Sequence, residues 1–346
     1  MTNLTQASRQ LFTRAVDERY ASLPELLRAT TDMKHRCQSA AVSRTEFRPF
    51  VYDSYLSFQR SNQLPIRLND WSFTQLCQLA GAAKDTVNRL AAETAVHVFQ
   101  DLLSARDDRD DALQALVVDD RIIRSVNGPG YRRLWNVDLV RLLMEYAIDF
   151  VPPQKGLNGA TGLYAGEQDM FCFLIDPTGW VEIEKEAFAP GFFVWNSEVG
   201  RRSIGIATFW FQRVCANHIV WDATEITEYT RRHTGKADTA FTEIRRLIEA
   251  LVAKRDERKD AFASTIAKAM HMRFGQSTEE VADQLVDAGF VKTLATRAAA
   301  IAEEKGSFSI WAVVDALTQL NREQSFAGNR SEADLKAAKL LALAAT

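Results

Sequence analysis

Two polar clusters interrupt the apolar segment from Phe192 to Asp222, and their residue types could support catalysis. The first cluster is Asn196-Ser197-Glu198 and the second is Cys215-Ala216-Asn217-His218. A carboxylate can act as a general acid or base, and a cysteine next to a histidine can act as a nucleophile. Hydrolysis is the reaction class that such a set fits best. The candidate catalytic residues are Glu198, Cys215, Asn217 and His218.

The spacing of Cys215 and His218 argues against a ready-made catalytic pair. On a continuous strand these two positions face opposite sides, so they converge only if the chain turns between them. Cysteine and histidine are also zinc ligands, but two ligands do not complete a zinc site. A cysteine between Val214 and Ala216 is more typical of apolar packing. We therefore expect no metal and no cofactor.

Basic residues near the same segment suggest a different function. Glu198 with Arg201 and Arg202 could form an acid catalyst with a basic clamp, although a salt-bridged hairpin loop is the simpler interpretation. A third interpretation is a strip of cations that, together with Trp195 and Trp221, binds a single strand by charge and stacking. The nucleic-acid-binding residues of this strip would be Arg201, Arg202, Arg213, Arg231, Arg232 and His233.

Composition limits the class of protein. Of 346 residues, 47% are hydrophobic and 25% are charged, which is typical of a folded globular chain. The 42 basic and 45 acidic side chains give a net charge of −3, so any contact with nucleic acid must come from a local patch. The N-terminal residues lack the features of a signal peptide, and no apolar run reaches the length of about 18 residues that a membrane span needs. These features predict a cytoplasmic, soluble protein with no membrane partner.

The pattern of elements predicts an α+β fold, with a predominantly antiparallel central sheet and helical portions packed against it. Residues 1–105 are predicted as a helical N-terminal portion, within which 73–90 have the spacing of a helix-turn-helix. Residues 116–235 are predicted to be β-rich and residues 239–321 helical. The tail, residues 324–346, is predicted to be loosely ordered.

Two hairpins are expected within the β-rich portion. One joins the strands 170–175 and 180–183 across the turn residues Asp176-Pro177-Thr178-Gly179. The other joins 192–195 to 203–211. Because both faces of the strand 204–211 are apolar, this strand should lie centrally in the sheet and be covered on both sides.

Two motifs in these hairpins resemble a known family. WNSEVG (195–200) and VCANHIVW (214–221) look like the signature of phage- and plasmid-borne proteins catalogued as domain of unknown function 932. Looser similarity covers residues 121–143, 162–174 and 309–320. The resemblance implies one integrated domain over residues 70–321 and a setting in mobile-element DNA metabolism. In outline only, the expected fold is similar to ring-forming single-strand annealing proteins of phages.

Three hypotheses for the function follow from these patterns. The first is a non-catalytic nucleic-acid-binding factor, with single-stranded DNA as its partner and a role in strand annealing or recombination, acting as a homo-oligomer. The second is a hydrolytic enzyme built on the candidate catalytic residues. The third is a structural or partner-binding protein. Binding of single strands at low salt separates the first from the others, and convergence of Glu198 and His218 in one pocket is required by the second.

Overall fold

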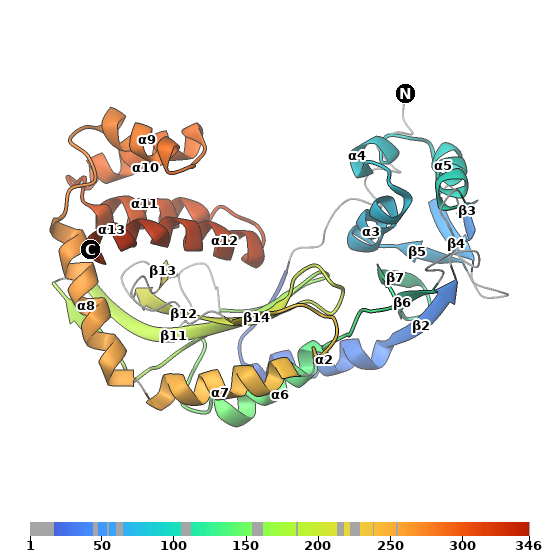
Figure 1. Cartoon of the computed structure of the whole chain (residues 1–346), viewed down its shortest axis with the longest axis horizontal. Helices are drawn as coiled ribbons and strands as arrows, with labels where there is room; N and C mark the ends of the chain where they lie inside the picture. Colours follow the sequence, from blue (N-terminus) through green and yellow to red (C-terminus); the bar gives the residue numbers. More distant parts are fainter. Residues whose placement is uncertain are drawn as a thin grey trace.

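The computed structural model shows an α+β protein shaped like a U, in which a bridge joins two lobes (Figure 1). This confirms the predicted fold class. The residues that the structure describes are 17–43, 48–53, 55–59, 65–104, 112–153, 162–184, 186–212, 218–221, 229–237, 239–253 and 255–345. Within them the strands form two separate sheets, one in the bridge and one in the N-terminal lobe.

The bridge is an antiparallel sheet with the strand order β1-β8-β9-β11-β12-β13, in which β10 also pairs with β11 and β14 with β12. Its strands are β1 (Glu18–Tyr20), β8 (Leu163–Ala165), β9 (Met170–Ile175), β10 (Val181–Ile183), β11 (Glu186–Asn196), β12 (Ile204–Gln212), β13 (His218–Trp221) and β14 (Tyr229–Arg231). Because β1 comes from the N-terminal end of the described chain, the packed unit extends beyond the predicted boundary at residue 70.

The long hairpin of β11 and β12 is at the centre of this sheet. Strand β12 pairs with β11 along one edge and with β13 and β14 along the other, and every residue in it is buried. The predicted hairpin and the predicted central strand are therefore confirmed. The other hairpin prediction is wrong, since β9 lies between β8 and β11. Strand β10 pairs instead with the start of β11, which is its nearer neighbour along the chain.

The two faces of the bridge sheet are packed differently. On one face, alternate residues of β11 such as Phe192 and Val194 pack against the helices α2 (Leu23–Arg36), α6 (Asn136–Tyr146) and α7 (Thr239–Ala253). On the other face, Phe193 and Trp195 belong to an aromatic cluster. Leu335 and Ala338, from the C-terminal lobe, pack on this aromatic face.

The N-terminal lobe corrects the prediction of a purely helical N-terminal portion. It holds a mixed sheet with the order β2-β6-β7-β5-β4-β3, in which β5 and β7 are parallel. Its strands are β2 (Cys37–Ser43), β3 (Arg48–Tyr52), β4 (Tyr55–Gln59), β5 (Ile66–Leu68), β6 (Ala112–Val118) and β7 (Ile122–Asn127). The early strands are short but rich in aromatic residues, which favour strands. Of these strands, β2 and β5 pair with β6 and β7, which lie much later in the chain. Strands β6 and β7, predicted for the central sheet, complete this one.

Three helices pack on the sheet of the N-terminal lobe. They are α3 (Asp70–Ala80), α4 (Lys84–Val87) and α5 (Ala92–Ser104). The second of them, α4, is a single turn of four residues. Such a short helix cannot serve as the recognition helix of a helix-turn-helix, which removes that interpretation.

The C-terminal lobe is helical, and its last segment is ordered rather than loose. Its helices are α8 (Arg255–His271), α9 (Thr278–Asp287), α10 (Lys292–Glu304), α11 (Ile310–Asn321), α12 (Ala327–Ala338), the 3₁₀ turn η3 (Lys339–Leu341) and α13 (Ala342–Ala345). Leu341 is fully buried in the core of this lobe, and Ala338 reaches the aromatic face of the bridge sheet. The alanines and leucines of the tail supply a small apolar face, which explains why the predicted loose tail is wrong.

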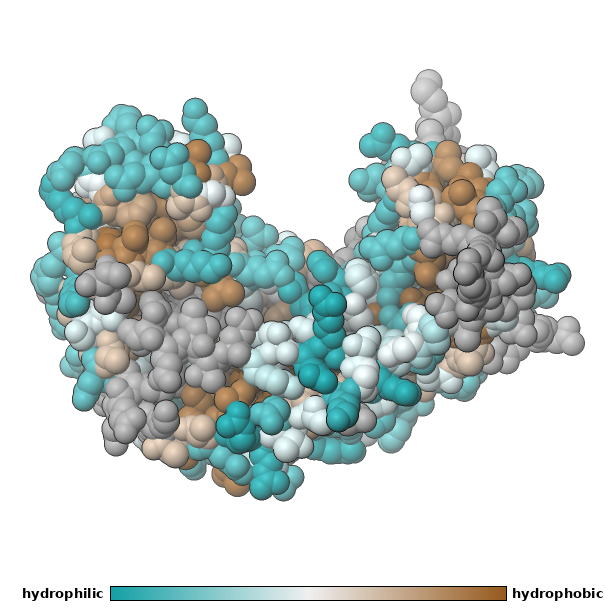
Figure 2. Space-filling model, in the orientation of Figure 1, coloured by the Kyte–Doolittle hydropathy of each residue, from teal (hydrophilic) through white to brown (hydrophobic). Residues whose placement is uncertain are grey.

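Among the helices that the structure describes, none has both the length and the apolar character that crossing a bilayer requires. Figure 2 shows a broad hollow between the two lobes, and the surface below this hollow at the centre of the view is largely hydrophilic. Figure 1 places β14 at the base of the gap between the lobes.

Candidate functional site

The loop between β11 and β12 carries the first predicted polar cluster, and this cluster is buried. Asn196 and Ser197 have no exposed surface, and Glu198 is 2% exposed. We call Asn196, Ser197, Glu198 and Val199 the joint, because they connect the bridge sheet to the N-terminal lobe. Each contact described next ties one of these four residues to a distant part of the chain.

Both carboxylate oxygens of Glu198 have structural partners. Arg124 Nη1 on β7 donates to Oε2 at 3.0 Å, and the backbone nitrogen of Asn136 donates to Oε1 at 2.9 Å. Asn136 is the first residue of α6, whose N-cap residue Trp135 makes no side-chain cap. Glu198 therefore caps α6 from another element, where a negative charge is also favoured by the helix dipole.

The other residues of the joint make equally specific contacts. Asn196 Nδ2 donates to Leu134 O at 2.8 Å, and Ser197 Oγ donates to Gln168 O at 2.6 Å. The carbonyl of Val199 accepts hydrogen bonds from two side chains of α3, which are Trp71 Nε1 at 2.9 Å and Gln75 Nε2 at 3.1 Å. The bonds to Val199 fix the loop against the N-terminal lobe, whereas the bonds of Asn196 and Ser197 fix it to the segments just before α6 and β9.

The backbone register separates Glu198 from His218. Trp195 pairs with Gly205 at the loop end of the hairpin, whereas His218 pairs with Gln212 at the opposite end of β12. At a rise of about 3.3 Å per residue, these two ends of β12 are roughly 20 Å apart. The predicted catalytic set therefore cannot act as one centre with Glu198 in it. Cys215 and Asn217 lie outside the described residues, as does Arg213.

His233, predicted as part of the cationic strip, is buried and neutral. It is 4% exposed, and its ring stacks on Tyr131 with the centroids 5.3 Å apart. Burial lowers the pKa of His233 to about 4. Nδ1 lies 3.2 Å from the carbonyl oxygen of Arg132, so Nδ1 carries the proton and donates it. A neutral, enclosed imidazole cannot contact a phosphate as a cation, which corrects this part of the prediction.

The arginines of the predicted strip that the structure describes lie at the loop end of β12. Arg201 is exposed, and its guanidinium lies over the Trp71 ring, 5.5 Å from the centroid. Arg231 pairs in register with Ile204, and the exposed Arg232 follows it. Arg132 was not predicted as part of this strip; it is exposed, and its backbone nitrogen donates to His233 O at 2.7 Å. Its signal was the basic pair in YRRLW (131–135).

Arg202 differs from these arginines because it is already paired. Its Nε donates to Asp169 Oδ2 at 2.8 Å, and its Nη1 contacts Glu332 on α12. In the described part of the chain, by contrast, Arg132, Arg201, Arg231 and Arg232 form no ion pair. We call these four the basic group.

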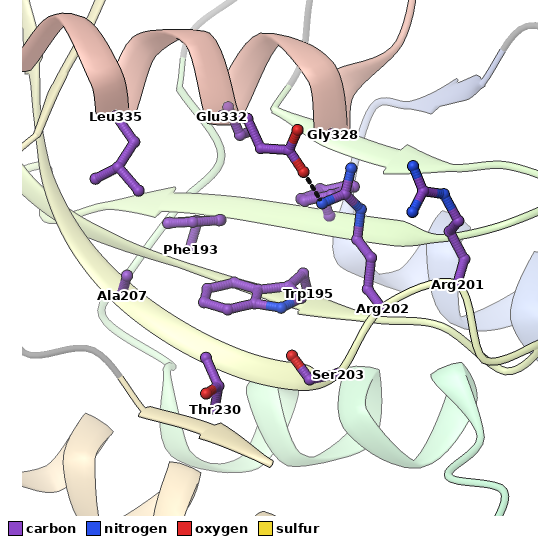
Figure 3. Close-up of a pocket in the computed structure, with 12 residues that line it drawn as sticks. Phe193, Trp195, Arg201, Arg202, Ser203, Ala207, Thr230, Gly328, Glu332 and Leu335 are labelled. Atoms are coloured by element: carbon purple, nitrogen blue, oxygen red, sulfur yellow. Dashed lines mark hydrogen bonds and ion pairs between the residues drawn. The ribbon is translucent and has the colours of Figure 1, made fainter. Parts of the chain in front are cut away.

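A pocket of about 350 Å³ lies between the aromatic face of the bridge sheet and α12. Phe193 and Trp195 lie beneath α12, and Arg201 and Arg202 lie side by side at one end (Figure 3). Trp195, predicted to be part of the strand-binding strip, is only 9% exposed and lines this pocket. The remaining lining residues are Phe171, Ser203, Ala207, Thr230, Gly328, Ser331, Glu332 and Leu335.

Small residues create the room for this pocket. A Cβ atom on Gly205 would lie 2.2 Å from Cζ2 of Trp195, so the indole lies against the bare backbone of β12. A Cβ atom on Gly328 would lie 2.5 Å from Arg202 Nη2, so glycine lets α12 lie directly against the Arg202 guanidinium as it is placed here. Sequence reasoning missed this pocket because its walls come from strands and from a helix in the tail.

Neither a metal cluster nor a known relative adds to this description. In the described residues, no group of three or more histidine, cysteine, aspartate or glutamate side chains is placed to hold a metal ion. No family model, no curated protein and no solved structure matches the chain.

Proposed function

We propose that the protein is a non-catalytic factor that binds single-stranded nucleic acid at the base of the hollow between its lobes. The observation that carries this proposal is the basic group, Arg132, Arg201, Arg231 and Arg232, whose charges have no acidic partner in the described chain. Cations without internal partners can neutralise phosphates and release their counterions, which drives binding.

Aromatic rings next to the basic group favour single strands over duplexes. Trp71 lies under the Arg201 guanidinium, and Tyr131 precedes Arg132 in the chain and is stacked on His233. Proteins that bind single strands combine a basic surface with rings on which bases can stack. The role in mobile-element DNA metabolism, in annealing or recombination, is proposed on the family resemblance of the two motifs.

The direct test is a binding panel at low salt. Labelled single- and double-stranded DNA and RNA are titrated with the full chain at several salt concentrations, and the mass of the assembly is measured. We expect single strands to bind most tightly, with an affinity that falls steeply as salt rises. Absence of binding to every nucleic acid at low salt would overturn the proposal.

Charge reversal locates the binding surface. Arg201→Glu and Arg232→Glu should each weaken binding about tenfold. Each should also reduce the slope of log affinity against log salt concentration by about one. The matched control is Lys292→Glu, which reverses an exposed charge on α10 in the C-terminal lobe. Equal affinities for wild type, both arginine variants and the control would show that the strand binds elsewhere.

A further inference from the structure

We propose that the pocket beneath α12 binds a single nucleobase. This inference rests on the proposed function, because it assigns the pocket to one base of the bound strand. It goes further because the basic group could bind phosphates without any pocket. The volume of about 350 Å³ is at the lower end of the range for small-molecule sites. A base fits this size, whereas a folded peptide segment does not.

The floor of the pocket suits a flat ring. Phe193 and Trp195 stack with centroids 4.8 Å apart and planes inclined by 27°. The indole of Trp195 lies directly against the backbone of Gly205. Since the ring is almost fully buried and lines the pocket, a ligand must enter the pocket to reach it. Stacking on such a ring is favourable for any base.

The end of the pocket suits the polar edge of a base. Arg202 offers donors and Glu332 offers acceptors, and the hydroxyls of Ser203 and Thr230 line the same cavity. Bases present both carbonyl acceptors and amino donors on their edges, and arginine and glutamate are among the side chains that pair with them. Lipid chains would exclude water from the Arg202–Glu332 ion pair without offering it hydrogen bonds, and free carboxylates would meet the negative charge of Glu332 and Asp169.

Arg201 connects the pocket to the basic group. It lines the pocket together with Arg202 and also belongs to the basic group at the base of the hollow (Figure 3). A strand held there by its phosphates could therefore direct one unstacked base beneath α12. The base could also come from a free mononucleotide, so the experiment has an arm for each source.

The experiment measures mononucleotides and an oligonucleotide separately. The four deoxynucleoside 5′-monophosphates are titrated by calorimetry, and a labelled single-stranded oligonucleotide by fluorescence anisotropy. Two variants fill the pocket from opposite walls, Ala207→Leu from β12 and Ser331→Phe from α12. Ala288→Leu, at an exposed position after α9, is the control. Thermal unfolding checks that each variant is folded. If a variant does not fold, the mononucleotide titration of the wild type still tests the pocket.

We expect at least one mononucleotide to bind the wild type and the control but not the filled variants. We also expect the filled variants to lose roughly 5- to 100-fold in oligonucleotide affinity, which is the range for one stacked base. Oligonucleotide binding that is equal in all proteins, without mononucleotide binding, would overturn the base pocket and leave the proposed function intact. Pocket-dependent mononucleotide binding without oligonucleotide binding would overturn the proposed function alone. Absence of both would overturn both.

Discussion

The joint lies in the loop of the β11–β12 hairpin and the pocket lies on the aromatic face of the same hairpin, yet their polar groups have different roles. In the joint, Glu198 is 2% exposed and bonded through both carboxylate oxygens. In the pocket, Glu332 also pairs with an arginine, but its side chain is 64% exposed. Similar residue types in one small region thus differ in whether they can meet a ligand.

Desolvation explains the difference. A buried carboxylate is stable as an anion only when a cation and hydrogen-bond donors replace water. Arg124 and the start of α6 supply these to Glu198, and the same contacts occupy its oxygens. A dense polar cluster in the sequence can therefore mark a structural connection, while ligand chemistry lies where glycine and aromatic residues leave space.

Removing the buried carboxylate should have the largest effect. Glu198→Ala leaves Arg124 charged in a buried position and α6 without its cap. We expect it to lower the free energy of unfolding by about 3–5 kcal/mol. Urea denaturation of wild type and variant measures the difference.

Glu198→Gln distinguishes the contribution of the negative charge from that of the helix cap. Its side-chain oxygen can still accept from the Asn136 nitrogen, so it should be less destabilising than Glu198→Ala while still leaving Arg124 unpaired. If Glu198→Ala cost less than about 1 kcal/mol, the joint would not depend on this ion pair, and Glu198 would return as a candidate for chemistry.

Local patterns in the sequence were enough to predict several elements. The alternation of apolar residues identified the β11–β12 hairpin, and the apolar residues on both faces of β12 identified its central place. A serine three residues before a glutamate is a typical helix start, and Ser277 caps α9 by accepting from Glu280 N. Glycine is a typical helix stop, and Gly289, just after this helix, has a φ of 85°. All of these signals act over a few residues.

What the sequence did not reveal depends on long-range contacts. Glu198 is 74 residues from Arg124 in the chain and 62 from Asn136, and no local pattern links them. The pocket likewise needs β12 next to α12, which comes from a tail predicted to be loose. The sequence therefore identified the hairpin as the important segment but not which of its residues are structural.

Acidification should lower the free energy of unfolding by a moderate amount through His233, which lies next to the joint. Tyr131, on which His233 stacks, donates to Ser197 O at 3.0 Å. The pKa of His233 is about 4 in the fold, below the usual 6.5. Between these values the unfolded chain binds the proton more readily. The contribution of His233 to the free energy of unfolding is therefore fully present above pH 6.5 and is lost as the pH falls toward 4. The loss is about 2 kcal/mol at pH 5.

The variant His233→Gln isolates this contribution. Urea denaturation at pH 7.5 and pH 5.0 should show that wild type loses about 2 kcal/mol more than the variant between the two conditions. His97→Gln, at an exposed position on α5, is the matched control. The same pH dependence in wild type and His233→Gln would contradict a buried, neutral imidazole.

The smallest effect is expected from Glu332→Ala, which removes a carboxylate from an arginine pair as Glu198→Ala does. Ion pairs of an exposed carboxylate contribute only about 0–1 kcal/mol, and the Glu332 side chain is 64% exposed, although that of Arg202 is 15% exposed. Arg202 also keeps its bond to Asp169. Urea denaturation should therefore place Glu332→Ala within about 1 kcal/mol of wild type. A loss as large as that of Glu198→Ala would mean that the Arg202–Glu332 pair holds α12 on the sheet. The polar end of the pocket would then be a structural contact, like the joint, and not a ligand-binding site.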